Sequence, residues 1–150
     1  MRLLTALLLC LAALPALAID YRSISGDAIL YDAPSVKGVK HFIIARGTPV
    51  EVVLTQEYWT KVRDSSGNMA WIEARLLSPA RTLIVRADKA DVRAEANEKS
   101  TVVFSAEKNV LLELIDTTQN PTPGWAKVKH RDDRGGELGG FVRASQVWGL

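Results

Sequence analysis

Tryptophan alternates with cationic residues in two stretches of the chain, residues 59–63 (Trp-Thr-Lys-Val-Arg) and residues 125–129 (Trp-Ala-Lys-Val-Lys). Successive side chains of a β-strand point to opposite faces, so the tryptophan and the cations of each stretch would share one face. An indole ring gives contact area to an apolar or ring-shaped ligand, and a neighbouring cation orients a carboxylate or phosphate on it. The pattern therefore predicts two sets of ligand-binding residues: Trp59, Lys61 and Arg63 in the first, and Trp125, Lys127 and Lys129 in the second.

The same pattern has a second interpretation, in which each tryptophan packs under its own loops. Large aromatic residues are mostly well buried, and the stems of Lys and Arg cover apolar surface while their charged ends stay in water. Tyr31 and Tyr58 also have two interpretations: they line the ligand surface together, or they place their hydroxyls at the rim of the fold. Trp71 and Phe141 are predicted to lie in the core, because each is followed directly by a β-branched apolar residue.

Groups for covalent or metal chemistry are few. The two histidines, His41 and His130, are not in a metal-ligand spacing such as H-x₃-H or H-E-x-x-H, and no G-x-S-x-G motif occurs. The acidic pair Asp132-Asp133 is flanked by arginines, so we expect a solvated turn there and not a calcium loop. We predict a protein without catalytic residues, metal or cofactor; a metal- or histidine-dependent hydrolase is the enzymatic alternative.

The first residues have the composition of an export signal. Arg2 gives a positive start, residues 3–14 are almost entirely apolar, Pro15 ends the run, and Ala16-Leu17-Ala18 is a small-x-small cleavage site. The run is too short to span a hydrocarbon core of ~30 Å, which needs about 20 residues. We predict a signal peptide at residues 1–18, cleaved after Ala18, and no stable membrane span thereafter. A lipoprotein anchored at Cys10 is the alternative, disfavoured by the leucines around that cysteine.

Charge and cysteine content exclude several classes of protein. Lys and Arg number 19 against 17 Asp and Glu, so the chain lacks the basic excess that nucleic-acid-binding domains usually show. Cys10 is the only cysteine and lies in the predicted leader. Disulfides and thiolate metal sites are therefore not expected after cleavage, and packing alone must hold the exported fold together.

Beyond residue 20 the chain shows no long helical period. Short runs of β-branched and aromatic residues are separated by Gly, Pro, Asn, Asp and Ser, a spacing typical of a β-sandwich or of small barrels. Residues 58–63 and 69–73 are predicted to form two strands around a polar turn at residues 64–68, and residues 74–77 a short 3₁₀ turn. The predicted fold class is all-β.

The second half of the chain repeats the first. A displacement of 62 residues places Leu30-Tyr31-Asp32-Ala33-Pro34 on Val92-Arg93-Ala94-Glu95-Ala96. Later matches follow in the same order, with the insertions confined to predicted loops, as expected for a duplicated fold: Trp59-Thr60-Lys61-Val62 with Trp125-Ala126-Lys127-Val128, and Ala70-Trp71-Ile72 with Gly140-Phe141-Val142. We predict two domains, residues 19–79 and 80–150.

Each half resembles a bacterial SH3 domain. Four segments carry the resemblance, and each occurs once in each half. They correspond to the family's L-N-V-R motif (residues 28–35 and 90–97), K-G-x-x-V-x-V motif (residues 45–52 and 107–112), G-W-x-K-V motif (residues 59–62 and 124–128) and G-W-V motif (residues 70–72 and 140–142). The resemblance covers nearly all of the chain after the leader. It implies a small barrel of five or six strands in each half, so that the complete fold is two consecutive SH3-like barrels after a cleavable signal peptide.

The resemblance also implies a class of function. Bacterial SH3 domains are often attached to cell-wall hydrolases, where they bind peptidoglycan or its peptide stems, and they occur alone in exported proteins. This chain is accordingly predicted to be an exported, most simply periplasmic, non-catalytic protein that binds peptidoglycan or an envelope peptide through aromatic-cationic grooves. The alternative is an envelope scaffold or regulatory subunit that binds a protein partner such as a hydrolase.

Overall fold

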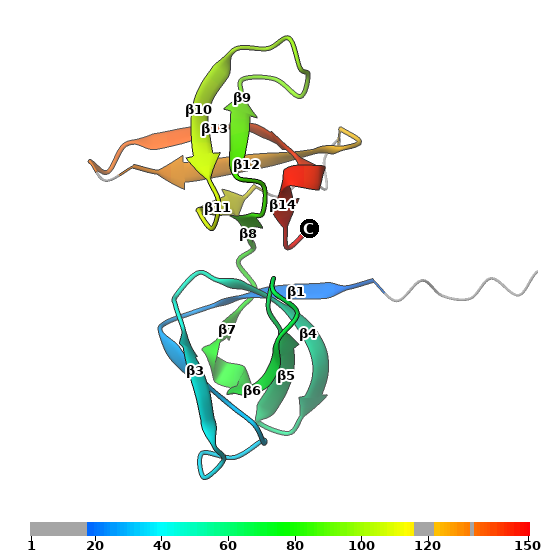
Figure 1. Ribbon diagram of the computed structural model, residues 1–150, viewed down its shortest axis with the longest axis vertical. Helices are drawn as coiled ribbons and strands as arrows, with labels where there is room; N and C mark the ends of the chain where they lie inside the picture. Colours follow the sequence, from blue (N-terminus) through cyan, green and yellow to red (C-terminus); the bar gives the residue numbers. More distant parts are fainter. Residues whose placement is uncertain (1–17, 116–121, 133) are drawn as a thin grey trace, which may run out of the picture.

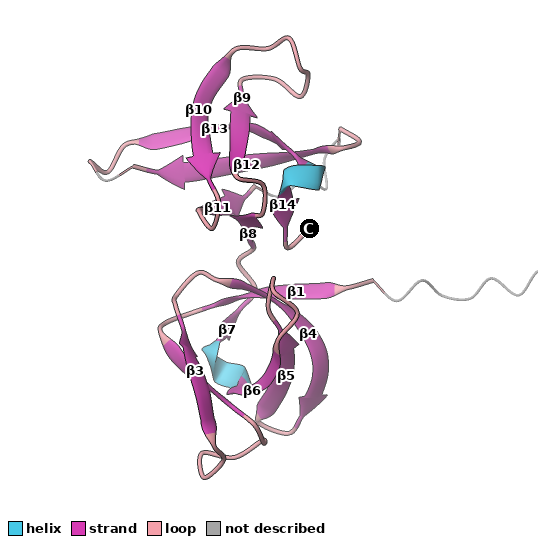
Figure 2. Cartoon of the chain, viewed as in Figure 1, coloured by secondary structure: helices cyan, strands magenta, loops and turns pink. Residues whose placement is uncertain are grey.

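The protein consists of two small β-barrels joined end to end (Figure 1). The computed structural model describes residues 18–115, 122–132 and 134–150. The predicted leader, apart from Ala18, lies outside the described residues, as does the lipoprotein alternative at Cys10. Within these ranges, two short 3₁₀ turns accompany the strands (Figure 2). The predicted fold class, all-β with two consecutive small barrels, is confirmed.

The first barrel is one seven-stranded sheet in the order β3-β2-β6-β5-β4-β1-β7. Its elements are β1 (Asp20–Ile24), β2 (Ala28–Tyr31), β3 (Lys40–Ile44), β4 (Pro49–Gln56), β5 (Trp59–Arg63), β6 (Met69–Glu73), the 3₁₀ turn η1 (Ala74–Leu76) and β7 (Leu77–Ser78). The sheet has more than the expected five or six strands, because the two-residue β7 pairs with β1 and extends it. The 3₁₀ turn predicted near residues 74–77 is confirmed.

The second barrel repeats this order with every strand number raised by seven, β10-β9-β13-β12-β11-β8-β14. Its elements are β8 (Thr82–Val85), β9 (Lys89–Arg93), β10 (Val102–Glu107), β11 (Leu111–Leu114), β12 (Trp125–Arg131), β13 (Glu137–Arg143), the 3₁₀ turn η2 (Ala144–Gln146) and β14 (Val147–Trp148). Within the described residues, no helix is both long and apolar enough to cross a bilayer.

Alternation of inward and outward side chains along strands such as β5 and β12 builds the two cores. In β5, Thr60 and Val62 are buried, while Trp59, Lys61 and Arg63 on the other face are half-buried. The inward residues of all strands meet in one apolar cluster per barrel. These clusters are Ile24, Ala28, Leu30, Ile44, Val50, Val62, Ala70 and Ile72 in the first barrel, and Leu83, Val85, Ala90, Val92, Ala106, Leu112, Ala126, Val128, Val142 and Val147 in the second.

The hairpins that carry the tryptophan strands are closed by an aspartate in each barrel. The Asp64 carboxylate accepts hydrogen bonds from the backbone N–H groups of Ser66 and Asn68, at 2.9 Å each. The Asp132 carboxylate does the same for Arg134 and Gly136, at 2.9 and 2.7 Å. Such bonds to nearby backbone are the ordinary use of aspartate in turns. Asp132 therefore acts as a turn residue; Asp133 lies outside the described residues.

Gly140 marks a place where the second barrel has less room than the first. Gly140 pairs with Val128 in the register, and the corresponding position opposite Val62 is Ala70. A Cβ added at Gly140 would lie 2.3 Å from the carbonyl oxygen of Arg93, which is far inside contact distance. The absence of a side chain at residue 140 therefore lets β13 and β9 approach closely.

We predict that Gly140→Ala lowers the free energy of unfolding by about 1–3 kcal/mol, the usual cost of overpacking a tight site. Gly26→Ala is the matched control: an added Cβ there would meet no atom within 4 Å, and a change within about 0.5 kcal/mol is expected. Urea denaturation monitored by tryptophan fluorescence measures both variants. Equal stability of the two variants would contradict the close contact at Gly140.

Aromatic and cationic side chains from both barrels pack where the barrels meet. Tyr21 of β1 contacts Trp148 of β14 edge to face, with ring centroids 5.0 Å apart and an angle of 79° between the rings. The guanidinium carbon of Arg81, in the connection between the barrels, lies 5.5 Å from the centre of the Tyr21 ring. Arg81 Nη2 donates a 2.6 Å hydrogen bond to the carbonyl of Gly149. Trp148 therefore lies at the seam between the two barrels.

A chain of hydroxyl groups crosses the same seam. Thr82 Oγ1 donates a 2.6 Å hydrogen bond to the carbonyl of Gly47 in the first barrel. The hydroxyls of Ser23 and Thr82 are 2.8 Å apart, and because the Thr82 proton is already used, Ser23 is the donor. Ser23 is buried, so its hydrogen bond is made away from competing water. The barrels are thus held by directional bonds as well as by ring packing.

Burial raises the pKa of the Tyr21 phenol above its ordinary value. The nearby Glu51 carboxylate acts in the same direction, whereas Arg81 and Arg63 oppose it. A raised pKa means that the folded protein favours the neutral phenol more than the unfolded chain does. This contribution to stability is fully present below the unfolded pKa of about 10 and is lost as the pH rises through the folded pKa.

We predict that the free energy of unfolding falls above about pH 10 and that Tyr21→Phe removes this part of the decrease. Ultraviolet absorbance titration should show the loss of a phenolate transition above about pH 10 in Tyr21→Phe. Tyr58→Phe is the control, because Tyr58 is 82% exposed. A Tyr21→Phe protein whose free energy of unfolding falls with pH as steeply as that of the parent would contradict the burial argument.

Candidate functional site

An aromatic surface covers the outer face of strands β2, β6 and β5 in the first barrel. The antiparallel register places Lys61 opposite Trp71 and Trp59 opposite Glu73, and Tyr31 also pairs with Trp71. Paired residues of neighbouring strands share a face. We call these five residues, Tyr31, Trp59, Lys61, Trp71 and Glu73, the first outer face.

The rings of the first outer face are held in a definite arrangement. Tyr31 and Trp59 meet edge to face, with centroids 5.5 Å apart and an angle of 89° between the rings. Lys61 Nζ lies 6.0 Å from the centre of the Trp71 ring, at the outer limit of a cation–π contact. Among the described residues, no carboxylate lies within ion-pair distance of Lys61.

The remaining predicted residues of the first barrel have other surroundings. Arg63 Nη1 is 3.1 Å from a carboxylate oxygen of Glu51, a half-buried ion pair at the end of β5. Tyr58 lies at the tip of the β4–β5 turn, next to Glu57, whose φ of 52° is left-handed. Tyr31 is buried under Trp59, whereas Tyr58 is exposed, so only Tyr31 is in ring contact with Trp59.

Trp71 is buried, as predicted, although it lies outside the apolar core cluster. The prediction that Phe141 lies in the core is wrong, because Phe141 is half-buried and not part of the core cluster. Ala70 and Ile72 of β6 face the core cluster, so Trp71 between them points to the outer face. It is nevertheless only 9% exposed, because neighbouring side chains of the outer face cover it. Phe141 is likewise on the outer side of β13, half-buried, with Lys127 Nζ 6.0 Å from its ring centre. Phe141 therefore adds to the candidate binding surface of the second barrel, whereas the buried Trp71 ring supports Lys61 beside it.

The second barrel has a corresponding surface with more positive charge. Trp125, Lys127 and Phe141 take the places of Trp59, Lys61 and Trp71. Arg93 pairs with Phe141 as Tyr31 pairs with Trp71, and Arg143 pairs with Trp125 as Glu73 pairs with Trp59. We call Arg93, Trp125, Lys127, Phe141 and Arg143 the second outer face. The guanidinium carbon of Arg143 lies 4.5 Å above the Trp125 ring, so this indole is partly covered.

A carboxylate of the protein itself occupies the second outer face. Glu98, in the loop between β9 and β10, pairs with Arg143 and has its other oxygen 3.7 Å from Arg93 Nε. The first barrel has no charge at the matching place, because the 62-residue displacement puts the exposed Val36 there. Among the described residues, Lys61 of the first outer face has no carboxylate within ion-pair distance, whereas Arg93 and Arg143 of the second outer face share the Glu98 carboxylate.

The two arginines near the ends of the hairpins, Arg75 and Arg143, are not at equivalent positions. The register matches Arg143 with Glu73. The Arg75 guanidinium instead bonds the Glu73 carboxylate, with 2.8 Å between Nε and Oε2. Insertions between the motifs change the number of residues that separates equivalent positions in the two barrels. Equivalent residues must therefore be identified from the register of the strands.

Lys129 and the histidines lie near other groups. Lys129 Nζ is 3.2 Å from Glu137 and 3.4 Å from Glu113, and hydrogen bonds to these carboxylates raise the pKa of the Lys129 ammonium. His41 is exposed on the edge strand β3, whereas His130 Nδ1 is 3.2 Å from the Leu111 carbonyl and its ring packs near Phe104. In the described ranges, no group of three or more His, Cys, Asp or Glu is placed to hold a metal ion.

Comparison with known families identifies the first barrel. A family described as the bacterial SH3 domain matches residues 25–79, which contain strands β2 to β7 and the whole first outer face. The first barrel is a bacterial SH3 domain. The second barrel has the same strand order and the same outer-face positions as this SH3 domain. A comparison with curated proteins finds no match.

Three solved structures are similar in fold. NlpC2 from Trichomonas vaginalis is 12% identical with a TM-score of 0.38, over 89% of this chain and 49% of that one. NlpC1 from the same organism is 13% identical with a TM-score of 0.37, over 93% and 49%. An NlpC/P60 family protein from Bacillus cereus is 14% identical with a TM-score of 0.37, over 86% and 56%. The chain thus spans about half the length of these structures, and similarity at this level bears on neither activity nor ligand.

The Glu98 carboxylate provides a direct test of the second outer face. We predict that Glu98→Gln makes Trp125 more accessible to iodide by about twofold, corresponding to roughly 0.4 kcal/mol for loss of one exposed charge beside two arginines. Quenching by neutral acrylamide should not change. The Trp125 signal is obtained by subtracting the spectrum of the matching Trp125→Phe protein.

Glu95→Gln is the matched control for this measurement. Glu95 lies in the same loop and bonds Asn97, not an arginine, so iodide quenching should stay at the parent value. If iodide quenching of Trp125 rises equally in both variants, the cause is the general loss of negative charge, and the interpretation that Glu98 neutralises Arg93 and Arg143 is contradicted. Because exposed ion pairs contribute little, Glu98→Gln should lower the stability by less than about 1 kcal/mol.

Proposed function

We propose that this protein is an exported, non-catalytic binding protein that recognises cell-wall peptidoglycan, or its peptide, through the first outer face. The observation that carries the proposal is the Tyr31–Trp59 ring pair beside Lys61, a cation with no carboxylate partner among the described residues. The family match supports a binding module, and the apolar leader at residues 1–18 supports export to the periplasm.

The chemistry of the first outer face supports a ligand with a ring or apolar side and an anionic group. Trp59 is half-buried, so one part of the indole is fixed against Tyr31 while the rest stays accessible. A sugar ring or alanine-like side chain would pack on the indole, and a carboxylate would lie against Lys61. Peptidoglycan combines sugar rings with peptide carboxylates, so it has both kinds of group.

The second outer face supports the same choice of ligand chemistry. There the protein's own Glu98 shows how a carboxylate lies between an arginine stacked on a tryptophan and a second arginine. A ligand carboxylate would have to displace Glu98 to bind in that place. We therefore assign the principal binding role to the first SH3 domain and a weaker one to the second barrel.

Sedimentation with purified peptidoglycan tests the proposal. Trp59→Ala should weaken retention by roughly 30-fold, because a central tryptophan typically contributes about 2 kcal/mol or more to an interface. Lys61→Gln keeps the rings and should weaken it about tenfold, the effect of losing one charge-assisted hydrogen bond. Trp125→Ala should have a smaller effect, since Arg143 and Glu98 already cover that ring.

Lys37→Gln is the charge-matched control for Lys61→Gln, because Lys37 is exposed in the loop between β2 and β3 and its side chain is not part of the outer face. It should bind peptidoglycan as the parent does. Circular dichroism and urea denaturation confirm that each variant is folded. The proposal is abandoned if the parent protein is not retained, or if Trp59→Ala and Lys61→Gln are retained like the parent.

A second candidate function is that of a scaffold for an envelope protein. Apolar side chains are exposed around β3, an edge strand that pairs only with β2: Ile43 is 74% exposed, Val39 65% and Val36 63%. Exposed apolar groups on an unpaired edge are typical of protein–protein contact. Co-purification from an envelope extract separates the two functions, because a stoichiometric protein without bound muropeptide would favour the scaffold.

A further inference from the structure

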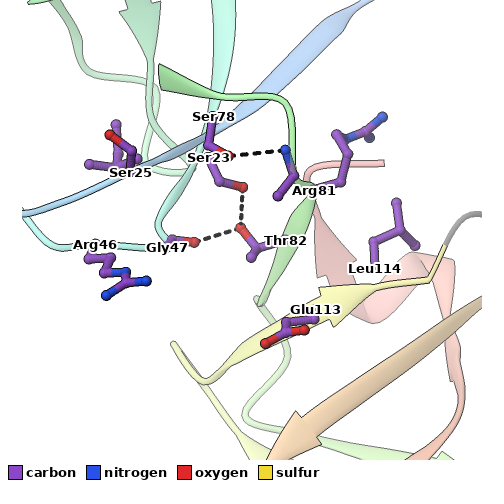
Figure 3. Close-up of a pocket in the computed structure, with 11 residues that line it drawn as sticks. Ser23, Ser25, Arg46, Gly47, Ser78, Arg81, Thr82, Glu113 and Leu114 are labelled. Carbon is purple, nitrogen blue, oxygen red and sulfur yellow. Dashed lines mark hydrogen bonds between the residues drawn. The ribbon is translucent and has the colours of Figure 1, made fainter. Parts of the chain in front are cut away.

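A cleft lies at the seam between the two barrels (Figure 3), and none of its lining residues belongs to either outer face. Two cavities lie along it, of about 400 and 380 Å³. They have four lining residues in common, Arg46, Gly47, Thr82 and Glu113, of which the first two belong to the first barrel and the last two to the second. The cleft is therefore a product of how the barrels are joined and belongs to neither barrel alone.

The floor of the cleft is held by bonds that already exist. Thr82 lies between Arg46 and Glu113 in Figure 3, with its hydroxyl bonded to the Gly47 carbonyl and to Ser23. Arg81 in the wall is fixed by the Gly149 carbonyl and the Tyr21 ring. Because these wall residues are already ordered, less conformational entropy is lost when a ligand binds.

The charge of the cleft is strongly one-sided. Its lining includes four cationic side chains, Arg46, Arg81, Lys129 and Arg131, against one carboxylate, Glu113. The chain as a whole is nearly balanced, with 19 Lys and Arg against 17 Asp and Glu, so the excess is local. A concave surface of one sign raises the local concentration of the opposite ion.

Arg46, which lines both cavities, is a cation of the cleft that is available to a ligand. Lys129 is bonded to Glu113 and Glu137, and Arg81 is used by Gly149 and Tyr21. Arg46 is exposed, and no carboxylate of the described ranges lies within ion-pair distance of its guanidinium. Its backbone is fixed, since its N–H donates a 2.8 Å hydrogen bond to Asp27 Oδ1.

We propose that the seam cleft is a second binding site, which takes a small oxyanion-bearing ligand with its carboxylate or phosphate group on Arg46. The planar guanidinium forms two parallel hydrogen bonds to either group. A cavity of about 400 Å³ is at the lower end of the usual range for small-molecule sites, roughly 300–1,000 Å³, and holds a group of the size of a dipeptide or a sugar phosphate. The site is independent of the first outer face.

Nuclear magnetic resonance titration of the intact two-barrel protein tests this site with defined probes. N-acetyl-alanyl-alanine supplies a peptide carboxylate, and inorganic phosphate supplies the other source of the oxyanion. The C-terminal amide of the same dipeptide is the neutral control. We expect saturable shifts of the Gly47, Thr82 and Glu113 amides with at least one oxyanion, none with the amide, and no shift of Gly67 at the distant β5–β6 turn.

Arg46→Gln should weaken this binding about tenfold, the effect of losing one charge-assisted contact, while Lys37→Gln leaves it unchanged. Trp59→Ala should also leave it unchanged, so the outcome is separate from the peptidoglycan test. Binding of only one of the two probes supports the site and shows whether it takes a carboxylate or a phosphate. The proposal is overturned if neither oxyanion shifts the cleft amides, if the neutral amide binds equally well, or if Arg46→Gln binds like the parent.

Discussion

The two-residue alternation of strands β5 and β12 is the constraint on which the rest of this structure depends. Because Thr60 and Val62 must be buried, Trp59 and Lys61 are forced outward together, and the antiparallel partner strand adds Trp71 to the same side. Slippage of the register by one residue would exchange core and surface completely. Each of these strands therefore carries core residues on one face and the residues of the candidate ligand site on the other. The packing of the apolar core fixes the geometry of that site.

Much of this arrangement can be predicted from the sequence, since short-range patterns determine it. The all-β class and the shared face of Trp59 and Lys61 follow from alternation, and the division into two similar halves follows from the repeat. The barrel form of each half is implied by the resemblance to bacterial SH3 domains. Trp71 shows the limit of such patterns: the ring is buried, as its apolar character predicts, but the alternation of Ala70, Trp71 and Ile72 places it outside the core cluster. Its burial comes from side chains of neighbouring strands, which a single strand's sequence does not specify.

Other features depend on contacts that are remote in sequence. Glu98 meets Arg143 across 45 residues, and Thr82 meets Gly47 across 35. No local pattern distinguishes Glu98 from a solvated loop carboxylate, and no motif indicates that Arg46 lines a cleft. Such contacts follow from strand register and barrel packing together. This is why the chemistry of the individual faces could be predicted, whereas the internal carboxylate and the seam cleft could not.

The seam also fixes the position of the two outer faces relative to each other. The connection between the barrels consists of residues 79–81 alone. It is held by the hydrogen bonds that join Ser23, Thr82 and Gly47, and by the contact of Tyr21 with Trp148. The barrels therefore lack the freedom that separate domains on a flexible tether would have. The spacing between the two outer faces is then a fixed property of the fold. On a polymer with a regular repeat, a rigid pair of this kind engages both faces only where the repeat matches that spacing.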